Sequence, residues 1–274
     1  MGSALRQGAK LLEDARISAP RLTAEVLLAH ALHHDRAWLY GHPEQKLREV
    51  EWLHYGRYLH QRLNGVPTQY ITRTQEFYGR PFRVTPDVLI PRPETEHVVE
   101  AALAVRGSAG RILDAGCGSG AIAVTLQIET GADVWATDIS QPALRVAADN
   151  ASRLGARVNL VACDLVDAIA GCSIDVLVSN PPYVPEAELE GLAREVRDHE
   201  PRIALTSGPT GFEIYERLIS GARRVLRPGG RLILELGYNG SGRVQSLLDG
   251  FEDIRLIADL AGIPRVVSCA LSFR

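Results

Sequence analysis

The stretch ILDAGCGSG, residues 112–120, decides the fold of this chain. It runs from an apolar segment that reads as a buried strand into a turn with three glycines, and a helix-like stretch follows the turn. Glycine adopts positive φ without strain and lets the backbone approach a ligand closely. We therefore expect a strand, a ligand-binding turn and a helix, in this order, near the start of an α/β domain.

Strand-like and helix-like segments alternate after this turn. Buried strands are predicted at Arg111–Ala115, Val134–Asp138, Asn159–Asp164, Ile174–Asn180 and Arg231–Leu236. Helical stretches separate the successive strands, and this pattern is typical of a mostly parallel sheet with helices on both faces. Two last apolar segments, Phe251–Ala258 and Arg265–Leu271, are close enough in sequence to pair as an antiparallel edge.

The chain before the α/β domain follows a helical period. From Leu5 to Leu63 the apolar residues recur three and four positions apart, which predicts a small helical bundle. Glycines and prolines between Thr74 and Ile90 indicate a short β-hairpin. The expected division is a helical domain at residues 1–72, a hairpin linker at 73–90 and an α/β domain at 91–274. Six histidines in the helical segment lack a spaced carboxylate or cysteine partner, so we predict no metal site.

The composition excludes several classes of protein. The 274 residues are 46% hydrophobic and 23% charged, which is typical of a soluble globular chain, and no apolar run approaches the roughly 20 residues that cross a bilayer. A net charge of −3 argues against a tight, sequence-independent grip on nucleic acid. The four cysteines are scattered, without the close pairs of a zinc site. We expect a cytoplasmic protein with reduced cysteines.

A carboxylate follows the glycine turn at the spacing of an adenosine site. Asp138 ends the second predicted strand about twenty residues beyond the turn, where it can accept both hydroxyl protons of a ribose. The first two glycines and Ala121 also fit the dinucleotide fingerprint, which keeps an NAD cofactor open. The tighter spacing of the three glycines resembles the first motif of Rossmann-like methyltransferases. In that family the position of Asp164, which closes the next strand, lies near the adenine amino group.

The tetrapeptide NPPY, residues 180–183, indicates the chemistry. It follows the fourth predicted strand, at the carboxyl edge of the sheet where open α/β folds bind their ligands. The side-chain oxygen of Asn180 and the backbone carbonyl of Pro181 can each accept one N–H of a planar NH₂ group. Pro181 and Pro182 have no backbone N–H, so this cradle is rigid and free of competing donors. Tyr183 can stack on the flat group, and we predict methyl transfer to a planar nitrogen.

Methylation of an amide nitrogen requires alignment and charge stabilisation, because the nitrogen lone pair is delocalised into the carbonyl. Holding nitrogen, methyl and sulfur in line can account for ~7 to 11 kcal/mol of the barrier. Positive charge moves from sulfur to nitrogen during transfer, so the two acceptors stabilise the transition state more than the ground state. Neither a metal nor a strong general base is required. The cradle serves adenine and glutamine equally well and does not choose between them.

The sequence around these motifs resembles the bacterial release factor glutamine methyltransferase family (PrmC/HemK) almost end to end. The resemblance includes LIPRPETE at residues 89–96, DHEP at 198–201, RPGG at 227–230 and the segments 65–79, 211–213, 235–237 and 259–267. It implies a Rossmann-like class I methyltransferase fold that uses S-adenosyl-L-methionine, with a mostly parallel seven-stranded sheet and an N-terminal helical bundle that docks the substrate. By this resemblance the cofactor contacts Gly116, Cys117, Gly118, Ser119, Gly120, Asp138, Asp164, Leu165 and Asn180.

The resemblance also implies the reaction. The family methylates the amide nitrogen N5 of the glutamine in the Gly-Gly-Gln loop of class I peptide chain release factors and releases S-adenosyl-L-homocysteine. Asn180, Pro181, Pro182 and Tyr183 would bind the glutamine, with Asn180, Pro181 and Tyr183 as the catalytic residues, in a protein expected to be a monomer. The chain departs from the family at Arg73, where a glycine is common, and reads GCGSG where GTGTG is common.

Three alternatives remain open on the sequence. One is a related enzyme that modifies a glutamine of a large-subunit ribosomal protein. Another is an adenine-N6 DNA methyltransferase, which the lack of an evident basic target-recognition domain disfavours. A third is a non-catalytic module that binds a translation factor through its helical domain.

Overall fold

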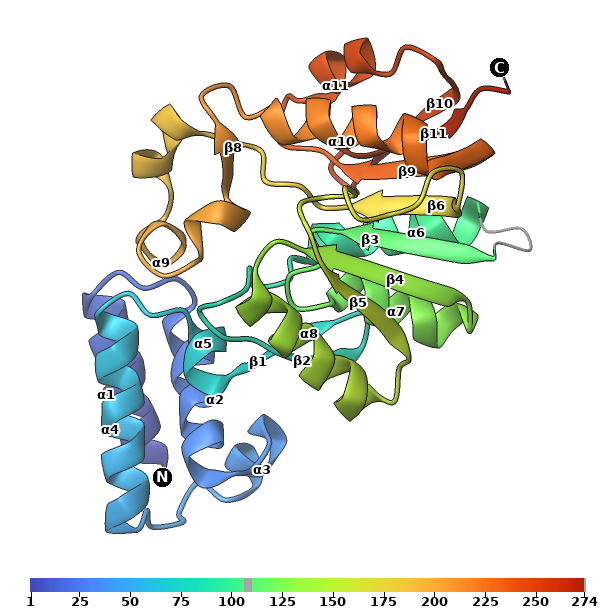
Figure 1. Ribbon diagram of the computed structural model, residues 1–274. Helices are drawn as coiled ribbons and strands as arrows, with labels where there is room; N and C mark the ends of the chain where they lie inside the picture. Colours follow the sequence, from blue (N-terminus) through green and yellow to red (C-terminus); the bar gives the residue numbers. More distant parts are fainter. Residues whose placement is uncertain (106–109, 274) are drawn as a thin grey trace. The chain divides into compact units, whose positions relative to one another are not determined.

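The computed structural model describes residues 1–105 and 110–273, and the chain divides into two compact units (Figure 1). We call them the helical unit, Met1–Thr74 with Ala193–His199, and the sheet unit, Gln75–Leu192 with the chain from Glu200 onward. No sequence signal pointed to the membership of Ala193–His199 in the helical unit. The three-part division of the sequence, with a linker at 73–90, stays a prediction.

The helical unit is a bundle whose core is apolar. Its helices are α1 (Gly2–Asp14), α2 (Pro20–Leu32), α3 (Arg36–Gly41), α4 (Glu49–Leu63), α5 (Thr68–Thr72) and α9 (Arg194–Arg197). Pro20 occupies the first turn of α2, where its fixed φ suits a helix start. Leu12, Leu27 and Leu28 are fully buried between the helices. The helical bundle predicted from the apolar period is confirmed.

A buried ion pair joins the two pieces of the helical unit. The Arg62 guanidinium on α4 donates to the Glu195 carboxylate on α9, and the Arg62 side chain is only 6% exposed. A buried guanidinium is costly unless a carboxylate faces it. This pair therefore ties the segment Ala193–His199 to α4.

Gly8 on α1 makes the helical unit sensitive to one added methyl group. A Cβ at Gly8 would lie 2.8 Å from Tyr55 Cζ, closer still to the Tyr55 hydroxyl, and 3.3 Å from Leu59 Cδ1. We expect Gly8→Ala to lower the free energy of unfolding by about 1–3 kcal/mol, because the buried Tyr55 ring must move. Urea or thermal unfolding followed by circular dichroism measures this change.

The matched control for Gly8→Ala is Gly56→Ala on α4. A Cβ at Gly56 meets no atom within 4 Å. Alanine favours the helix over glycine by roughly 0.5–1 kcal/mol, so this substitution should stabilise the bundle slightly. Equal effects of the two substitutions would contradict the packing at Gly8.

The sheet unit is built on seven strands in the order β10-β11-β9-β6-β3-β4-β5. The strands are β3 (Arg111–Ala115), β4 (Asp133–Asp138), β5 (Val158–Ala162), β6 (Ile174–Ser179), β9 (Leu226–Glu235), β10 (Phe251–Ala258) and β11 (Pro264–Leu271). The pairs β3·β4, β4·β5, β3·β6 and β6·β9 are parallel, whereas β11 is antiparallel to both β9 and β10. The predicted α/β fold with an antiparallel edge is confirmed.

Some predicted strand ends are wrong by a few residues. The third strand ends at Ala162 and the fourth at Ser179, so Asp164 and Asn180 lie in the loops beyond them. The fifth strand begins at Leu226 instead of Arg231, with a register shift against β6 between Ile174 and Val176. Asp164 and Asn180 therefore belong to loops at the carboxyl edge of the sheet. Binding residues are often found on loops that a rigid sheet positions.

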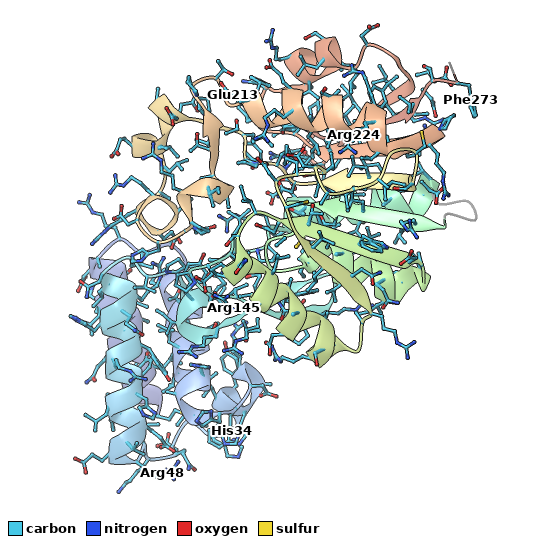
Figure 2. The ribbon with its side chains drawn as sticks, viewed as in Figure 1. His34, Arg48, Arg145, Glu213, Arg224 and Phe273 are labelled. Carbon is cyan, nitrogen blue, oxygen red and sulfur yellow. The ribbon has the colours of Figure 1, made fainter. Side chains whose placement is uncertain are left out.

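Helices cover both faces of the sheet. They are α6 (Glu96–Val105), α7 (Ala121–Thr130), α8 (Gln141–Leu154), α10 (Glu213–Val225) and α11 (Ser241–Leu247). Alternate strand residues face opposite sides: Ile112 packs in the cluster with α6, α7 and α8, and Leu113 packs in the cluster with α10 and α11. Side chains fill the layers between the sheet and its helices (Figure 2). Shorter elements are β1 (Thr74–Phe77), β2 (Arg80–Arg83), η1 (Pro93–Thr95), β7 (Val184–Pro185), η2 (Glu186–Gly191), η3 (Arg202–Ala204) and β8 (Thr206–Gly208).

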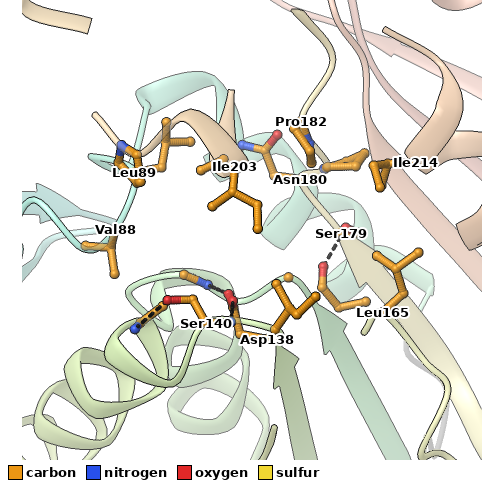
Figure 3. Close-up of a pocket in the computed structure, with 18 of the residues that line it drawn as sticks. Val88, Leu89, Asp138, Ser140, Leu165, Ser179, Asn180, Pro182, Ile203 and Ile214 are labelled. Carbon is orange, nitrogen blue, oxygen red and sulfur yellow. Dashed lines mark hydrogen bonds between the residues drawn. The ribbon is translucent and has the colours of Figure 1, made fainter. Parts of the chain in front are cut away.

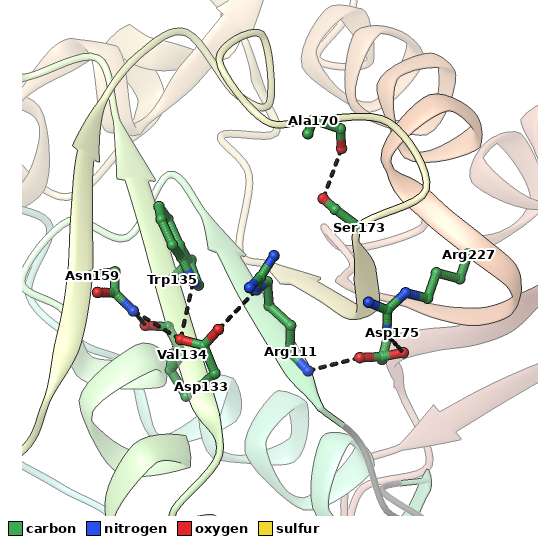
Figure 4. A network of polar contacts seen from close by, with 9 residues as sticks. All are labelled: Arg111, Asp133, Val134, Trp135, Asn159, Ala170, Ser173, Asp175 and Arg227. Carbon is green, nitrogen blue, oxygen red and sulfur yellow. Dashed lines mark hydrogen bonds and ion pairs between the residues drawn. The ribbon is translucent and has the colours of Figure 1, made fainter.

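A polar network fixes the strands at the end of the sheet where β3 begins (Figure 4). The backbone N–H of Arg111 donates to Asp175 at 2.7 Å, and its guanidinium donates to Asp133 at 2.8 Å. Asp133 also accepts from Trp135 and Asn159, and the neighbouring Arg111 guanidinium lowers the pKa of the Asp133 carboxyl. These bonds help to set the register of the parallel strands. The register also determines how the carboxyl ends of the strands line up, and ligands bind at those ends.

Candidate active site

A pocket lies at the carboxyl ends of β3, β4 and β6 (Figure 3). The strand order reverses here, because the chain passes from β5 at one edge to β6 on the other side of β3. Open α/β sheets bind ligands at such a reversal. The lining includes Gly116, Gly118, Asp138, Ile139, Ser140, Asp164, Leu165, Asn180, Pro181, Pro182, Ile203 and Arg217.

The glycine turn leaves the pocket open to a ligand. Gly116, Gly118 and Gly120 have φ values of +75°, +52° and +79°, a region that favours glycine. A Cβ at Gly116 or Gly118 would meet no atom within 4 Å, so their missing side chains leave empty space. At Gly120 a Cβ would lie 3.1 Å from the Ala147 Cβ, so this glycine lets α7 pack against α8. The first two glycines leave room for a ligand, and the third lets the two helices pack together.

The other two residues of the turn do not line the pocket. The side chains of these residues, Cys117 and Ser119, are buried. Burial, with the nearby Asp114 and Asp138 carboxylates, raises the pKa of the Cys117 thiol. Burial also raises the pKa of Asp114 to about 7. The Cys117 thiol is therefore protonated at neutral pH and is not a nucleophile.

Asp138 is held rigidly at the end of β4. Its two carboxylate oxygens accept the backbone N–H groups of Gly118, at 2.9 Å, and Ser140, at 2.8 Å. Burial raises the pKa of this carboxyl, although these backbone donors oppose the shift. Each oxygen keeps a further lone pair for a ligand hydroxyl. Ile139 follows, and its exposed side chain gives the pocket an apolar wall.

Asp164 and Leu165 line the side of the pocket nearest α10. Asp164 accepts from the Arg217 guanidinium at 2.6 Å, and both side chains are partly exposed. Leu165 has a φ of +47°, and its carbonyl accepts the Thr137 hydroxyl at 2.6 Å. The structure thus brings both predicted residues to the pocket. Arg217, which the sequence analysis missed, belongs to an ordinary amphipathic helix and carries no local signal.

The four residues of the NPPY motif have different surroundings. Asn180, Pro181 and Pro182 line the pocket. Tyr183 packs beside Gly237 instead, where a Cβ on the glycine would lie 2.8 Å from the ring, and burial raises the pKa of its hydroxyl to about 12. The Tyr183 ring therefore packs against the backbone just beyond the end of β9.

The Asn180 carboxamide is the first member of a hydrogen-bonded series. Its Nδ2 lies 3.1 Å from the Thr95 hydroxyl, and this hydroxyl lies 2.6 Å from Oε2 of Glu235, with both Thr95 and Glu235 buried. The Asn180 oxygen takes no part in these bonds. Neither Thr95 nor Glu235 was predicted as a site residue, since a threonine at a helix start and a glutamate at a strand end are common.

No group of three or more histidine, cysteine, aspartate or glutamate side chains that could hold a metal occurs within residues 1–105 and 110–273. Over the same ranges, no helix has the length and apolar character needed to cross a membrane.

Two family models match the chain. Residues 3–72 match the PrmC N-terminal domain, and residues 96–196 match the methyltransferase small domain. Together they cover the helical segment before the hairpin and the pocket residues from Gly116 to Pro182.

Curated relatives match nearly the whole chain. A release factor glutamine methyltransferase of Koribacter versatilis is 45% identical over 262 residues, 94% of this chain and 94% of its own length. Relatives of the same name from Nitratidesulfovibrio vulgaris and Bacillus subtilis are 43% and 39% identical, over 96% and 90% of this chain and 92% and 90% of their own lengths.

Solved structures share the fold over a large part of the chain. A methyltransferase from Pyrococcus furiosus gives a TM-score of 0.55 at 18% identity, over 72% of this chain and 91% of that protein. The hMettl16 catalytic domain, solved with MAT2A 3′UTR hairpin 6, gives a TM-score of 0.58 at 17% identity, over 79% and 82%. At these identities the likeness shows a shared fold only.

Proposed function

This chain belongs to the release factor glutamine methyltransferase family, and from this premise we propose that it methylates N5 of the glutamine in the Gly-Gly-Gln motif of class I peptide chain release factors. It is an S-adenosylmethionine-dependent protein glutamine methyltransferase. The observation that carries the proposal is the Asn180 carboxamide, which binds Thr95 through its NH₂ end and lines the same pocket as an open glycine turn.

The pocket residues fit S-adenosyl-L-methionine. The cofactor supplies an electrophilic methyl group on a positively charged sulfur and leaves as S-adenosyl-L-homocysteine. Gly116 and Gly118 leave room for its close approach, and Asp138 has lone pairs left for the ribose hydroxyls. Asp164, Leu165 and the exposed Ile139 line the same pocket and would surround the adenine.

The NPPY motif holds the methyl acceptor. The Asn180 oxygen and the Pro181 carbonyl each accept one N–H of the glutamine amide, which turns the nitrogen toward the methyl group. Because positive charge develops on this nitrogen, the same two oxygens stabilise the transition state more than the bound substrate. The prolines offer no backbone donor that would compete. The proton of the methylated amide then passes to water, so no general base is needed.

We further propose how the protein meets its partner. The helical unit docks the release factor and the pocket receives the Gly-Gly-Gln loop, in the cytoplasm where translation ends. The enzyme acts as a monomer and makes no tight contact with nucleic acid, in keeping with its net charge of −3.

Labelled methyl transfer tests the proposed function. The purified protein should transfer a labelled methyl group from S-adenosyl-L-methionine to a class I release factor, and mass spectrometry should place it on the glutamine of the Gly-Gly-Gln peptide. A release factor with this glutamine replaced by alanine should take up no label. Transfer to a ribosomal protein or to DNA, with the release factor unlabelled, would overturn the proposal.

A further inference from the structure

A carboxamide can present opposite chemistry to its ligand. One end of the Asn180 side chain is an acceptor oxygen and the other is an NH₂ with two donors. Only the oxygen can bind the N–H of a glutamine amide, whereas the NH₂ would repel it. Rotation of the side-chain amide by half a turn would therefore abolish the site without changing its shape.

The fold brings two polar side chains to Asn180 from distant parts of the chain. Glu235 is the last residue of β9, which is the parallel neighbour of β6. Ser179 of β6 pairs with Leu234 of β9, so the next residues, Asn180 and Glu235, lie on neighbouring strands at the carboxyl edge of the sheet. Thr95 lies at the end of η1 and stands between them, 3.1 Å from Asn180 Nδ2 and 2.6 Å from Glu235 Oε2.

The chemistry of Glu235 gives this series a direction. An ionised carboxylate only accepts hydrogen bonds, so the single hydroxyl proton of Thr95 must point to Glu235. The Thr95 oxygen is then an acceptor on its other side, and it can bind Asn180 only through the NH₂ group. The Asn180 oxygen is thereby left to face the pocket.

The surroundings of Glu235 let its charge titrate near neutrality. Burial raises the pKa of Glu235 to about 7; the Thr95 hydroxyl opposes the shift and the Glu94 carboxylate adds to it. Arg92 and Arg265 lower the pKa more weakly, and the neighbouring phenols of Tyr183 and Tyr215 stay neutral in this range. Tyr215 donates to the backbone carbonyl of Glu235 and not to the carboxylate. At pH 8 and above, Glu235 is mainly ionised.

We propose that Thr95 and Glu235 are positioning residues that fix the Asn180 carboxamide with its oxygen toward the methyl-accepting nitrogen. This inference rests on the proposed function, because it names the groups that prepare the same site for an N–H donor. Protonated Glu235 donates to the Thr95 oxygen, which frees the Thr95 hydroxyl to donate to Asn180. The carboxamide then turns over, so methyl transfer is lost as pH falls through the pKa of Glu235.

Thr95→Val and Thr95→Ser form the matched pair that tests the hydroxyl. Valine keeps the shape of threonine but removes the hydroxyl, and serine keeps the hydroxyl. At pH 8.5 we expect Thr95→Val to lower kcat on the release factor by about 10- to 100-fold, with binding of S-adenosyl-L-methionine nearly unchanged. Its melting temperature should fall, because the buried Glu235 carboxylate loses the hydroxyl that faces it. Thr95→Ser should keep most of the activity. A Thr95→Val enzyme as active as the wild type would overturn the inference.

The pH profile of kcat tests Glu235. The wild-type profile should fall on the acid side with a midpoint near 7. Glu235→Gln removes the titrating group, and glutamine can turn either end toward Thr95, so kcat should be lower and this fall should disappear. Asp114, whose pKa is also about 7, is unchanged in this variant. If kcat of Glu235→Gln falls on the acid side with the same midpoint as the wild type, Glu235 is not the residue that titrates.

A measurement without substrate separates the inference from the proposed function. The side-chain amide resonances of Asn180, assigned by their loss in Asn180→Ala, should shift in Thr95→Val and stay in place in Thr95→Ser. Should the wild-type enzyme leave release factors unmethylated, the proposed function fails, yet this shift would still show the hydrogen bond. If the Asn180 resonances do not move in Thr95→Val and the wild-type enzyme methylates release factors, the inference is rejected and the proposed function stands.

Discussion

Asn180→Ala is expected to lower kcat on a release factor by about 100- to 1,000-fold, as the loss of one preorganised transition-state contact does in other enzymes. The alanine removes the only side-chain oxygen among the three NPPY residues that line the pocket. The Pro181 carbonyl then holds the target amide alone, and the nitrogen is free to turn away from the methyl group. Binding of S-adenosyl-L-methionine should weaken much less, because the glycine turn and Asp138 are unchanged.

Single-turnover kinetics with labelled cofactor, together with calorimetric titration of the cofactor, measure the two effects separately. The control is Asn159→Ala, which removes an asparagine that donates to Asp133 in the network of Figure 4, away from the pocket. It should leave kcat near the wild-type value, because Asp133 keeps its bonds to Arg111 and Trp135. An Asn180→Ala enzyme that keeps its kcat would show that the motif does not bind the methyl acceptor.

Asp138→Asn is expected to weaken binding of S-adenosyl-L-methionine by about 100-fold, even though aspartate and asparagine have the same shape. Both Asp138 oxygens accept backbone N–H groups, from Gly118 and from Ser140. A carboxamide has only one oxygen, so one of these N–H groups must face an NH₂. An unmatched polar group of this kind costs about 1–3 kcal/mol, and the glycine turn can relieve it only by moving.

Equilibrium dialysis or calorimetry with S-adenosyl-L-methionine measures this loss of affinity. Asp164→Asn is the comparison, because Asp164 is partly exposed and faces the flexible Arg217 side chain instead of rigid backbone donors. A solvated ion pair contributes little, so its effect should be several times smaller. If the two substitutions had equal effects, Asp138 would not organise the turn.

The sequence predicted those parts of the fold that depend on local patterns. Apolar runs separated by helical periods indicated the parallel sheet and the helices on both faces, and the glycines at 116, 118 and 120 indicated the turn. The order of the glycine turn, Asp138 and the NPPY motif also indicated a methyltransferase. These features are readable because hydrophobic period and glycine conformation act over a few neighbouring residues.

Features that depend on distant contacts could not be predicted. Thr95 and Glu235 are separated by 140 residues, and only the pairing of β6 with β9 brings Glu235 beside Asn180. The contact of the Tyr183 ring with the distant Gly237 could not be predicted either, and the stacking role of Tyr183 stays a prediction. The fifth strand was predicted to start at Arg231, yet β9 already begins at Leu226.

The placement of Ala193–His199 in the helical unit means that the backbone passes between the two units at three points. The N-terminal region is therefore not a detachable module. Deleting residues 1–74 would remove the helices that form the helical unit together with α9. Deleting Ala193–His199 instead would leave the buried Arg62 guanidinium without the Glu195 carboxylate. A chimera that exchanges this region between relatives must transplant both pieces of chain together.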